Sequence, residues 1–254
     1  MSEHVAAGGG SHYFGPQAAR YAEIRPTYPV ALFHYLAVTS RHSRLAWDCA
    51  TGNGQAAVGL AERFARVVAT DASAEMITHA VPHPRVSYGE ARYDSGIDAG
   101  TCDLVTVAQA LHWLDIAALF AEVRRVLAPG GLFAAWCYAL CRIEPAVDEV
   151  VDAFYRITLG SYWPPERRHV DDGYRSIALP IDELVVPPFD MTQAWTLSEM
   201  CRYVRTWSSV GQLRAARGDA PLLGFEDSLR EAWGDAGVRR RVTFPLRFRA
   251  GHLR

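Results

Sequence analysis

Acidic residues and glycines recur at short spacing near residue 50, where Asp48, Ala50, Gly52 and Gly54 are followed by Asp71. Two glycines in one turn let the backbone approach a bound molecule closely, and free N–H groups at a helix start favour a polar or anionic group. An acid about 20 residues beyond such a turn can accept hydrogen bonds from ribose hydroxyls, although an acid after a strand often only caps a helix. We therefore expect a nucleotide-like cofactor here.

A second polar group comprises Gln109, His112 and Trp113, which follow the apolar run 103–108. His112 lies near the expected carboxyl end of a strand, where open α/β sheets bind their ligands. It is a candidate general base, and hydrogen bonding to the backbone or shaping a pocket is an equally open role. All 26 Lys+Arg residues are arginine, so lysine-based chemistry is excluded.

Strands and helices are expected to alternate over residues 44–138. The glycine turn follows a short apolar run and opens a helix with Ala57, Leu60 and Phe64 at helical spacing. Further apolar runs predict strands at 67–71, 86–88, 103–108 and 132–136. Asp115 is expected to cap the helix before the last of these. This alternation is typical of a parallel sheet with helices on both faces, so the expected class is α/β, Rossmann-like and doubly wound.

The regular alternation ends after residue 138. Pro145 begins a predicted helix, a proline-broken aromatic and basic loop spans 162–169, and Thr196 with Glu199 forms a capping box for a helix that continues to Trp207. The other predicted elements are a strand at 189–196, a helix at 222–233 and a strand at 242–248. We expect a helical cap together with the last strands of the same sheet.

The expected organisation is a single domain with three parts. Residues 1–40 form an N-terminal lid segment, 41–138 a cofactor-binding core, and 139–254 the cap and last strands. The aromatic-rich stretch 13–36 within the first part also suits a helix packed on the edge of the core. No linker separates a second independent domain.

Composition favours small-molecule chemistry. The 254 residues are 50% hydrophobic, with a formal net charge of −2 that gives no global attraction to nucleic acid or anionic membranes. The C-terminal arginines are interpreted as charges of an edge strand, not as a nucleic-acid site; they are Arg239, Arg240, Arg241, Arg247, Arg249 and Arg254. The five scattered cysteines suit buried thiols, and we expect no metal site. No signal-peptide core or run of 18 apolar residues occurs, so we expect a cytoplasmic protein.

These motifs resemble the class I S-adenosylmethionine-dependent methyltransferases. The resemblance covers about residues 13–138 and rests on Asp48 to Gly54, on Asp71, on Gln109 to Trp113, and on the turn 127–131. It implies a mostly parallel, seven-stranded sheet and S-adenosyl-L-methionine as the cofactor. Segments 21–29, 108–113 and 206–208 further resemble the branch that contains trans-aconitate methyltransferases.

The resemblance also implies roles for individual residues. The motif at Asp48, with the backbone at Ala50, Gly52 and Gly54, would hold the methionine part of the cofactor, and Asp71 with Ala72 would bind the ribose. Ala91 and Arg92 would bind the adenine. Gln109, His112 and Trp113 would form the floor beside the sulfonium, and three N-terminal residues would close over the cofactor: Tyr13, Tyr21 and Arg25.

Two positions depart from the pattern of the family, since Ala50 replaces a frequent glycine and Arg92 a frequent acid. Methyl transfer is an in-line displacement that needs alignment and exclusion of water, and a carboxylate or phenolate acceptor needs no base. Arginine can bind a carboxylate through two hydrogen bonds and aromatic rings can line a pocket. The candidate substrate residues are Tyr138, Arg142, Trp163, Arg167, Arg168 and Arg205.

Two alternative functions stay open at this point. A nicotinamide-dependent oxidoreductase is suggested because residues 52–57 formally fit the G-x-G-x-x-A pattern. The second alternative is a protein that binds S-adenosylmethionine structurally or for a reaction other than methylation. It stays open because a fold does not determine a function. An acceptor cavity beside the sulfonium would argue against the second alternative. The oligomeric state cannot be read from the sequence.

Overall fold

The chain is described by a computed structural model over residues 26–254. The N-terminal candidates Tyr13, Tyr21 and Arg25 lie outside this part of the chain. Five parallel strands form the core, in the order β3-β2-β1-β4-β5, followed by β8 and β6. The strands are β1 (Leu45–Cys49), β2 (Arg66–Asp71), β3 (Val86–Glu90), β4 (Cys102–Ala108), β5 (Leu127–Tyr138), β6 (Ile181–Glu183), β7 (Asp190–Trp195) and β8 (Arg240–Leu253).

The expected α/β class with a mostly parallel sheet is confirmed. Strand order reverses between β1 and β4, so the crevice where ligands bind in such folds is predicted at the ends of these two strands. Seven strands follow one another across the sheet, as predicted. An eighth strand, β7, pairs only with β8.

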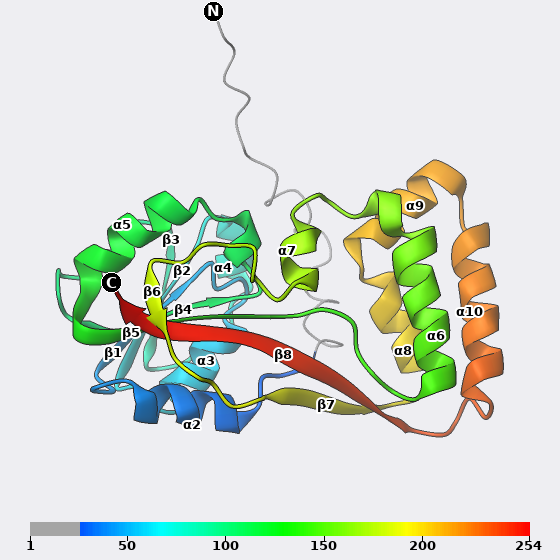
Figure 1. The fold of residues 1–254 in the computed structure, drawn as a ribbon, viewed down its shortest axis with the longest axis horizontal. Helices are drawn as coiled ribbons and strands as arrows, with labels where there is room; N and C mark the ends of the chain where they lie inside the picture. Colours follow the sequence, from blue (N-terminus) through cyan, green and yellow to red (C-terminus); the bar gives the residue numbers. More distant parts are fainter. Residues whose placement is uncertain (1–25) are drawn as a thin grey trace, which may run out of the picture.

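Helices cover both faces of this sheet (Figure 1). On one face, α2 (Val30–Thr39) and α3 (Gln55–Ala61) pack their apolar residues against those of β1, β4 and β5. On the other face, α5 (Ile116–Val126) packs against the alternate residues of the same strands. The Asp115 carboxylate accepts from the N–H groups of Ala117 and Ala118, so its predicted capping role is confirmed.

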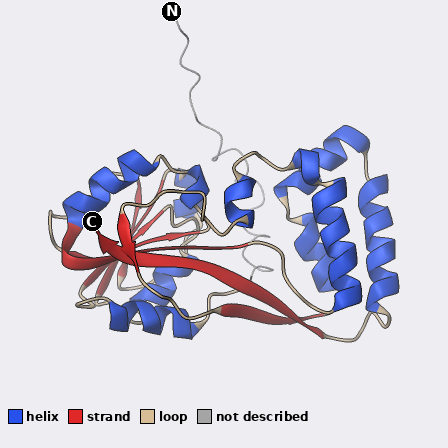
Figure 2. Cartoon of the chain, viewed as in Figure 1, coloured by secondary structure: helices blue, strands red, loops and turns tan. Residues whose placement is uncertain are grey.

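A helical cap forms the second half of the molecule (Figure 2). Its helices are α6 (Pro145–Ala153), the π-helix η4 (Phe154–Thr158), the 3₁₀ helix η5 (Gly160–Tyr162), α8 (Leu197–Arg205), α9 (Ser208–Arg217) and α10 (Ala220–Trp233). Helix α7 (Arg167–Asp171) lies between the cap and the core (Figure 1), where it contacts β5. The capping box of Thr196 and Glu199 is present at the start of α8. Two short helices belong to the core: α4 (Ala74–Thr78) and the 3₁₀ helix η3 (Leu111–Trp113).

One helix of the cap differs from the prediction. The helix that begins after Thr196 ends at Arg205, and Trp207 adopts an extended conformation before α9. The Thr206 hydroxyl donates to the Tyr203 carbonyl oxygen at 2.6 Å, a local bond that competes with continuation of the helix backbone. Helix α9 is therefore a separate element that the sequence pattern did not predict.

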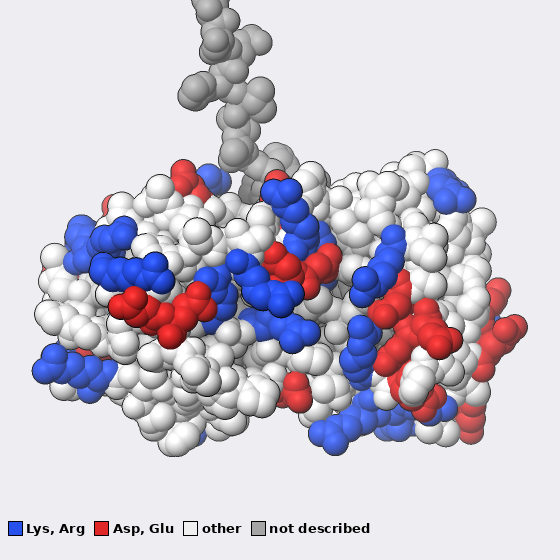
Figure 3. Space-filling model, in the orientation of Figure 1, with Lys and Arg blue, Asp and Glu red and all other residues white. Residues whose placement is uncertain are grey.

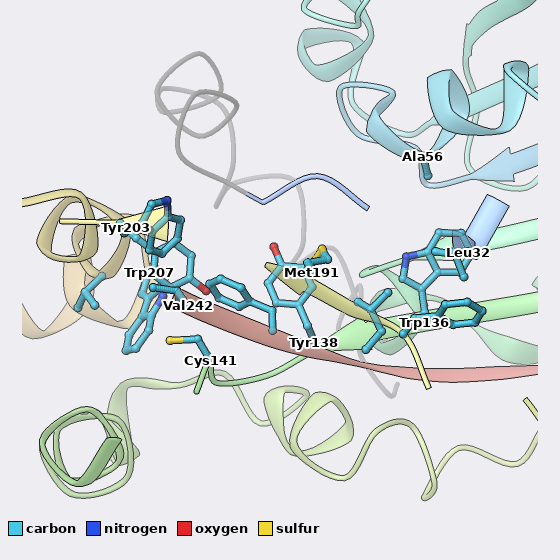
Figure 4. Packing of buried hydrophobic residues seen from close by; sticks show 14 of the residues in the cluster. Leu32, Ala56, Trp136, Tyr138, Cys141, Met191, Tyr203, Trp207 and Val242 are labelled. Atoms are coloured by element: carbon cyan, nitrogen blue, oxygen red, sulfur yellow. The ribbon is translucent and has the colours of Figure 1, made fainter. Parts of the chain in front are cut away.

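Strand β8 connects the core to the cap. Its residues 246–252 pair antiparallel with β5, whereas residues 240–245 pair with β7. One buried apolar cluster continues along this connection, from Leu32 and Trp136 through Tyr138 to Trp207 (Figure 4). The cap and the core are thus joined by shared packing as well as by the chain.

The interpretation of the C-terminal arginines as an edge strand is wrong, because β8 has partners on both sides. Four of these arginines form ion pairs with carboxylates, and acidic and basic side chains are interspersed on the surface (Figure 3). The pairs are Arg239–Glu199, Arg240–Glu144, Arg249–Glu183 and Arg254–Asp182. None of the helices between residues 26 and 254 has the length and apolar character needed to cross a membrane.

Candidate active site

A cavity of about 820 Å³ lies at the carboxyl ends of the parallel strands and is bounded by the cap. The loop after β1 contributes Ala50 to Asn53, the last residue of β2 and the loop after it contribute Asp71 to Ser73, and the segment after β4 contributes Gln109 and Ala110. The segment 163–166 and Gln212 of α9 line it from the cap. Core and cap residues that are distant in the sequence therefore meet around one space.

The glycine loop has a left-handed backbone at three of its residues. The φ angles are +58° at Gly52 and +85° at Gly54, and Ala50 also has a positive φ of +55°. Gly54 does not line the cavity, but a Cβ atom there would lie 2.2 Å from the Tyr88 hydroxyl oxygen. Gly54 therefore has no room for a side chain at the start of α3. Ala50 adopts the left-handed conformation that the more frequent glycine adopts at lower cost.

Asp71 connects the two loops at the wall of the cavity. One of its carboxylate oxygens accepts from the N–H of Gly52 at 2.8 Å and the other accepts from the N–H of Ser73 at 2.9 Å. These bonds fix the carboxylate while leaving further lone pairs for a ligand. Ala72 lines the cavity next to it.

Asp48 lies below the glycine loop, fully buried and outside the lining of the cavity. Its carboxylate accepts from the hydroxyls of Thr51 at 2.5 Å and Thr106 at 2.7 Å. Burial raises the pKa of Asp48 to about 6, against the lowering effect of these two bonds. Asp48 thus holds the loop to β4 and contacts the cavity only through Thr51.

Of the two residues expected to bind the adenine, one lines the cavity and the other does not. Arg92 lines the cavity, whereas the N–H of Ala91 donates to the Asp71 carbonyl oxygen at 2.9 Å and Ala91 does not line it. Met76 and Leu114 line the same space and were not predicted. Their apolar side chains are suited to cover the faces of a flat ring.

Gln109, His112 and Trp113 all line the cavity, as the sequence pattern predicted for one site. Gln109 has a positive φ of +58°, and its amide nitrogen donates to the Tyr138 carbonyl oxygen at 3.1 Å. The His112 Nδ1 lies 3.2 Å from the Tyr174 hydroxyl. Burial, together with the nearby charges of Arg167 and His169, lowers the pKa of His112 to about 3. His112 is neutral at physiological pH and a weak base.

Trp163 and Tyr138 are the two candidate substrate residues that line the cavity. The Trp163 indole N–H donates to the Tyr155 carbonyl oxygen at 3.2 Å, which fixes the ring against the cap. The Arg167 guanidinium lies 4.7 Å from the centre of the Trp163 ring and donates to the Tyr155 hydroxyl at 2.7 Å. Arg167 therefore packs against the Trp163 ring and does not itself line the cavity.

The other three candidate arginines do not line the cavity either. Arg142 forms an ion pair with Asp152 at 3.0 Å, and Arg205 forms two hydrogen bonds with Glu226, at 2.6 and 2.7 Å. Arg168 is exposed on α7. Charge alone predicted these residues, and the structure places them in contacts within the cap or at its surface.

Several lining residues were not among the predicted site residues, although Tyr28 belongs to the aromatic-rich stretch 13–36 and Glu166 to the loop 162–169. Tyr28 and Gln55 lie beside the N-terminal side of the cavity, where the Gln55 amide donates to the Pro26 carbonyl oxygen at 3.2 Å. The polar cap residues Glu166 and Gln212 belong to segments whose position relative to the core depends on the packing of the cap. The spacing within Trp163-Pro164-Pro165-Glu166 indicated a loop but not its location.

The comparisons with known proteins agree in the kind of protein they identify. A family model described as a methyltransferase domain matches residues 47–135. A Dictyostelium discoideum protein named as a methyltransferase is 30% identical over 242 residues, which cover 92% of this chain and 92% of that protein. A Saccharomyces cerevisiae protein named as an S-adenosylmethionine-dependent methyltransferase is 27% identical over 182 residues, 64% of this chain and 58% of that protein.

Solved structures show the same similarity. A structure described as a type II methyltransferase from Anaeromyxobacter dehalogenans is 43% identical, with a TM-score of 0.86, and covers 90% of this chain and 97% of that one. A methyltransferase structure from Anabaena variabilis is 13% identical, with a TM-score of 0.55, over 92% of this chain and 100% of that one. The second similarity shows a shared fold only.

Proposed function

Because this chain belongs to the class I S-adenosylmethionine-dependent methyltransferases, we propose that it methylates a phenolic oxygen of a small molecule bound between the core and the cap. Its cofactor is S-adenosyl-L-methionine. The nicotinamide alternative is set aside on the same ground, and the cavity that reaches the cap argues against the alternative without methyl transfer. One observation carries the acceptor proposal: the cavity extends from the glycine loop to Trp163, Glu166 and Gln212 of the cap.

The core end of the cavity fits the cofactor. Gly52 leaves this part of the loop without a side chain, and a Cβ atom on Gly52 would lie 3.2 Å from the Met76 methyl carbon. The Asp71 carboxylate faces the same space with its position fixed by two backbone N–H groups. Asp71 would bind the ribose hydroxyls, and the loop at Ala50 to Gly52 would hold the methionine part.

The cap end of the cavity is the proposed acceptor site. Tyr138 and Trp163 supply aromatic walls, and Pro164 adds a rigid apolar surface. A volume of about 820 Å³ is within the range of small-molecule sites, roughly 300–1,000 Å³, and leaves space for a second molecule. A flat aromatic acceptor suits these walls.

A phenol is favoured over a carboxylate because the described lining contains a single arginine, Arg92, at the cofactor end. A carboxylate acceptor, which the resemblance to trans-aconitate methyltransferases suggests, needs a cation or several donors at the cap end. Arg142 and Arg205 are committed to other carboxylates. A phenol needs no such partner.

S-adenosyl-L-methionine, held at Asp71 and the loop Ala50 to Gly52, would supply a methyl group activated by its sulfonium for in-line transfer to the acceptor oxygen, with the electron pair of the broken sulfur–carbon bond returning to sulfur. The protein aligns the acceptor oxygen and excludes water. His112, whose Nδ1 lies 3.2 Å from the Tyr174 hydroxyl, is a weak base and therefore helps to shape the site without removing the proton. The phenol loses its proton to solvent before it enters the site, so the acceptor's own pKa sets the fraction present as reactive phenolate.

The test is the formation of S-adenosylhomocysteine from S-adenosylmethionine with para-cresol, a halogenated phenol of lower pKa, and trans-aconitate as acceptors. We expect turnover of both phenols, with the pH profile shifting to lower pH for the more acidic one. Turnover of trans-aconitate alone would replace the phenol with a carboxylate. Turnover of neither class, with S-adenosylmethionine bound, would overturn the small-molecule oxygen proposal.

A further inference from the structure

Two polar side chains from the cap line the cavity opposite the glycine loop. Glu166 directly precedes α7, and Gln212 lies on α9. Across residues 26–254, neither side chain takes part in a hydrogen bond or an ion pair. The carboxylate of Glu166 and the amide of Gln212 are therefore available to a bound molecule.

Both residues are held in place by the packing of their segments. Pro164 and Pro165 restrict the backbone immediately before Glu166. The neighbouring residues Val210 and Leu213 are buried, which fixes α9, and Gln212 between them is half-buried. Helix α9 also contacts η5, the element that leads into the segment 163–166 (Figure 1).

The environment of these two side chains is mostly apolar. Trp163 and Tyr138 supply aromatic rings to the same cavity. A carboxylate in such a site accepts hydrogen bonds and cannot donate them, and it loses solvation whenever an apolar ligand covers it. A ligand that brings a hydrogen-bond donor compensates this loss, whereas a ligand that brings a carboxylate increases it.

We propose that Glu166 and Gln212 select the acceptor by binding a hydrogen-bond donor at its end away from the methylated oxygen. The acceptor is then a phenol that carries a hydroxyl or a protonated amine on its side chain, and phenols with a carboxylate at this position are rejected. The inference rests on the proposed acceptor site at the cap. Glu166 and Gln212 act as specificity-determining residues and take no part in the transfer step.

The experiment compares four para-substituted phenols that differ at the end of the side chain: ethylphenol, tyrosol, tyramine and hydroxyphenylpropionate. The measured quantity is kcat/KM for release of S-adenosylhomocysteine. We expect tyrosol and tyramine to exceed ethylphenol by about 10-fold, as one good hydrogen bond to a charged group provides, and hydroxyphenylpropionate to be the poorest substrate.

Variants assign the preference to residues. Glu166→Gln should lower the ratio of kcat/KM for tyramine to that for ethylphenol and raise the same ratio for hydroxyphenylpropionate, because it removes the charge and keeps the shape. Gln212→Leu should reduce the preference for tyrosol. Glu149→Gln, at an exposed acid of α6, is the matched control and should change none of the four values.

Three outcomes separate this inference from the proposed function. Equal use of all four phenols by the native protein, or equal effects of Glu166→Gln and Glu149→Gln, would overturn the selection by Glu166 while leaving phenol methylation intact. Failure to methylate any phenol would overturn the proposed function. In that case calorimetry measures the binding of the four phenols to the complex with S-adenosylhomocysteine. A preference for tyramine that is lost in Glu166→Gln supports the inference. If the native protein shows no preference for tyramine, or Glu166→Gln keeps it, the inference is overturned.

Discussion

A Cβ atom on Gly54 would lie 2.2 Å from the hydroxyl oxygen of Tyr88, and 2.8 Å from two carbons of the same ring. The Tyr88 hydroxyl is itself fixed, because it donates to the Val81 carbonyl oxygen at 2.8 Å. The start of α3 and strand β3 therefore pack with no space for even a methyl group. This contact explains why residue 54 is a glycine, whereas the cavity does not, because Gly54 does not line it.

The first prediction concerns this contact. Gly54→Ala adds both a clash and a strained φ of +85°, so we expect the free energy of unfolding to fall by about 2–4 kcal/mol and S-adenosylmethionine binding to weaken. Gly96→Ala is the control, because Gly96 has a φ of +64° with nothing within 4 Å of its Cβ position. It should cost only about 1 kcal/mol. Equal losses in thermal unfolding would show that strain alone, and not Tyr88, requires Gly54.

Asp71 is the subject of the second prediction. Asp71→Asn removes the charge and turns an amide toward the N–H of Gly52 or Ser73, so one hydrogen bond becomes a repulsion between two donors. We expect the affinity for S-adenosylmethionine, measured by calorimetry, to fall by about 100-fold, which corresponds to about 2.7 kcal/mol. Glu75→Gln, at an exposed acid on α4, should leave the affinity unchanged. An Asp71→Asn protein with native affinity would remove Asp71 from the cofactor site.

Most of the core could be predicted because its signals are local. An apolar run ending in an acid, a glycine turn and a following amphipathic helix lie within about 20 residues, and each depends on backbone physics close to it. Strand β8 could be predicted as a strand, but not its place between β5 and β7. Pairing partners depend on contacts between distant segments, and residues 240–245 and 246–252 have different ones.

The candidate site was predictable on the core side for the same reason. Asp71 ends a strand and Ala50, Gly52 and Gln109 follow strands, and parallel strands bring their carboxyl ends together. On the cap side, residue type alone was misleading. Arg205 has a carboxylate partner 21 residues away, which no spacing rule indicates. No sequence feature indicates that Gln212 lines the cavity, because its position depends on how α9 packs.

The third prediction concerns His112 and pH. Its pKa is lowered to about 3, so the unfolded state binds the proton more readily than the folded state. The stability associated with neutral His112 is complete above its ordinary pKa of 6.5 and is lost as the pH falls toward about 3. At about pH 5 the loss amounts to roughly 2 kcal/mol. Urea unfolding at several pH values should show this loss reduced in His112→Gln and unchanged in His34→Gln, at an exposed histidine.

The fourth prediction concerns Asp48, whose effect has the opposite sign. Its pKa is raised to about 6, so folding disfavours the charged carboxylate, and the stability contributed by Asp48 increases as the pH falls from about 6 to about 4. Asp48→Asn removes this gain of roughly 1 kcal/mol at about pH 5. The same urea series should therefore show a steeper loss of stability in acid for Asp48→Asn than for the native protein. Parallel curves would contradict the raised pKa.

The fifth prediction separates structural arginines from substrate-binding ones. Arg205 makes two hydrogen bonds to Glu226, whose side chain is only 9% exposed, so Arg205→Leu leaves a nearly buried carboxylate without its partner. We expect the free energy of unfolding to fall by about 2 kcal/mol, less than for a fully buried pair because the Arg205 side chain is 52% exposed. The KM of Arg205→Leu for the acceptor should equal that of the native protein. The double variant Arg205→Leu with Glu226→Leu should recover part of the stability, since no unpaired charge remains. A raised acceptor KM in Arg205→Leu at unchanged stability would instead return Arg205 to the acceptor site.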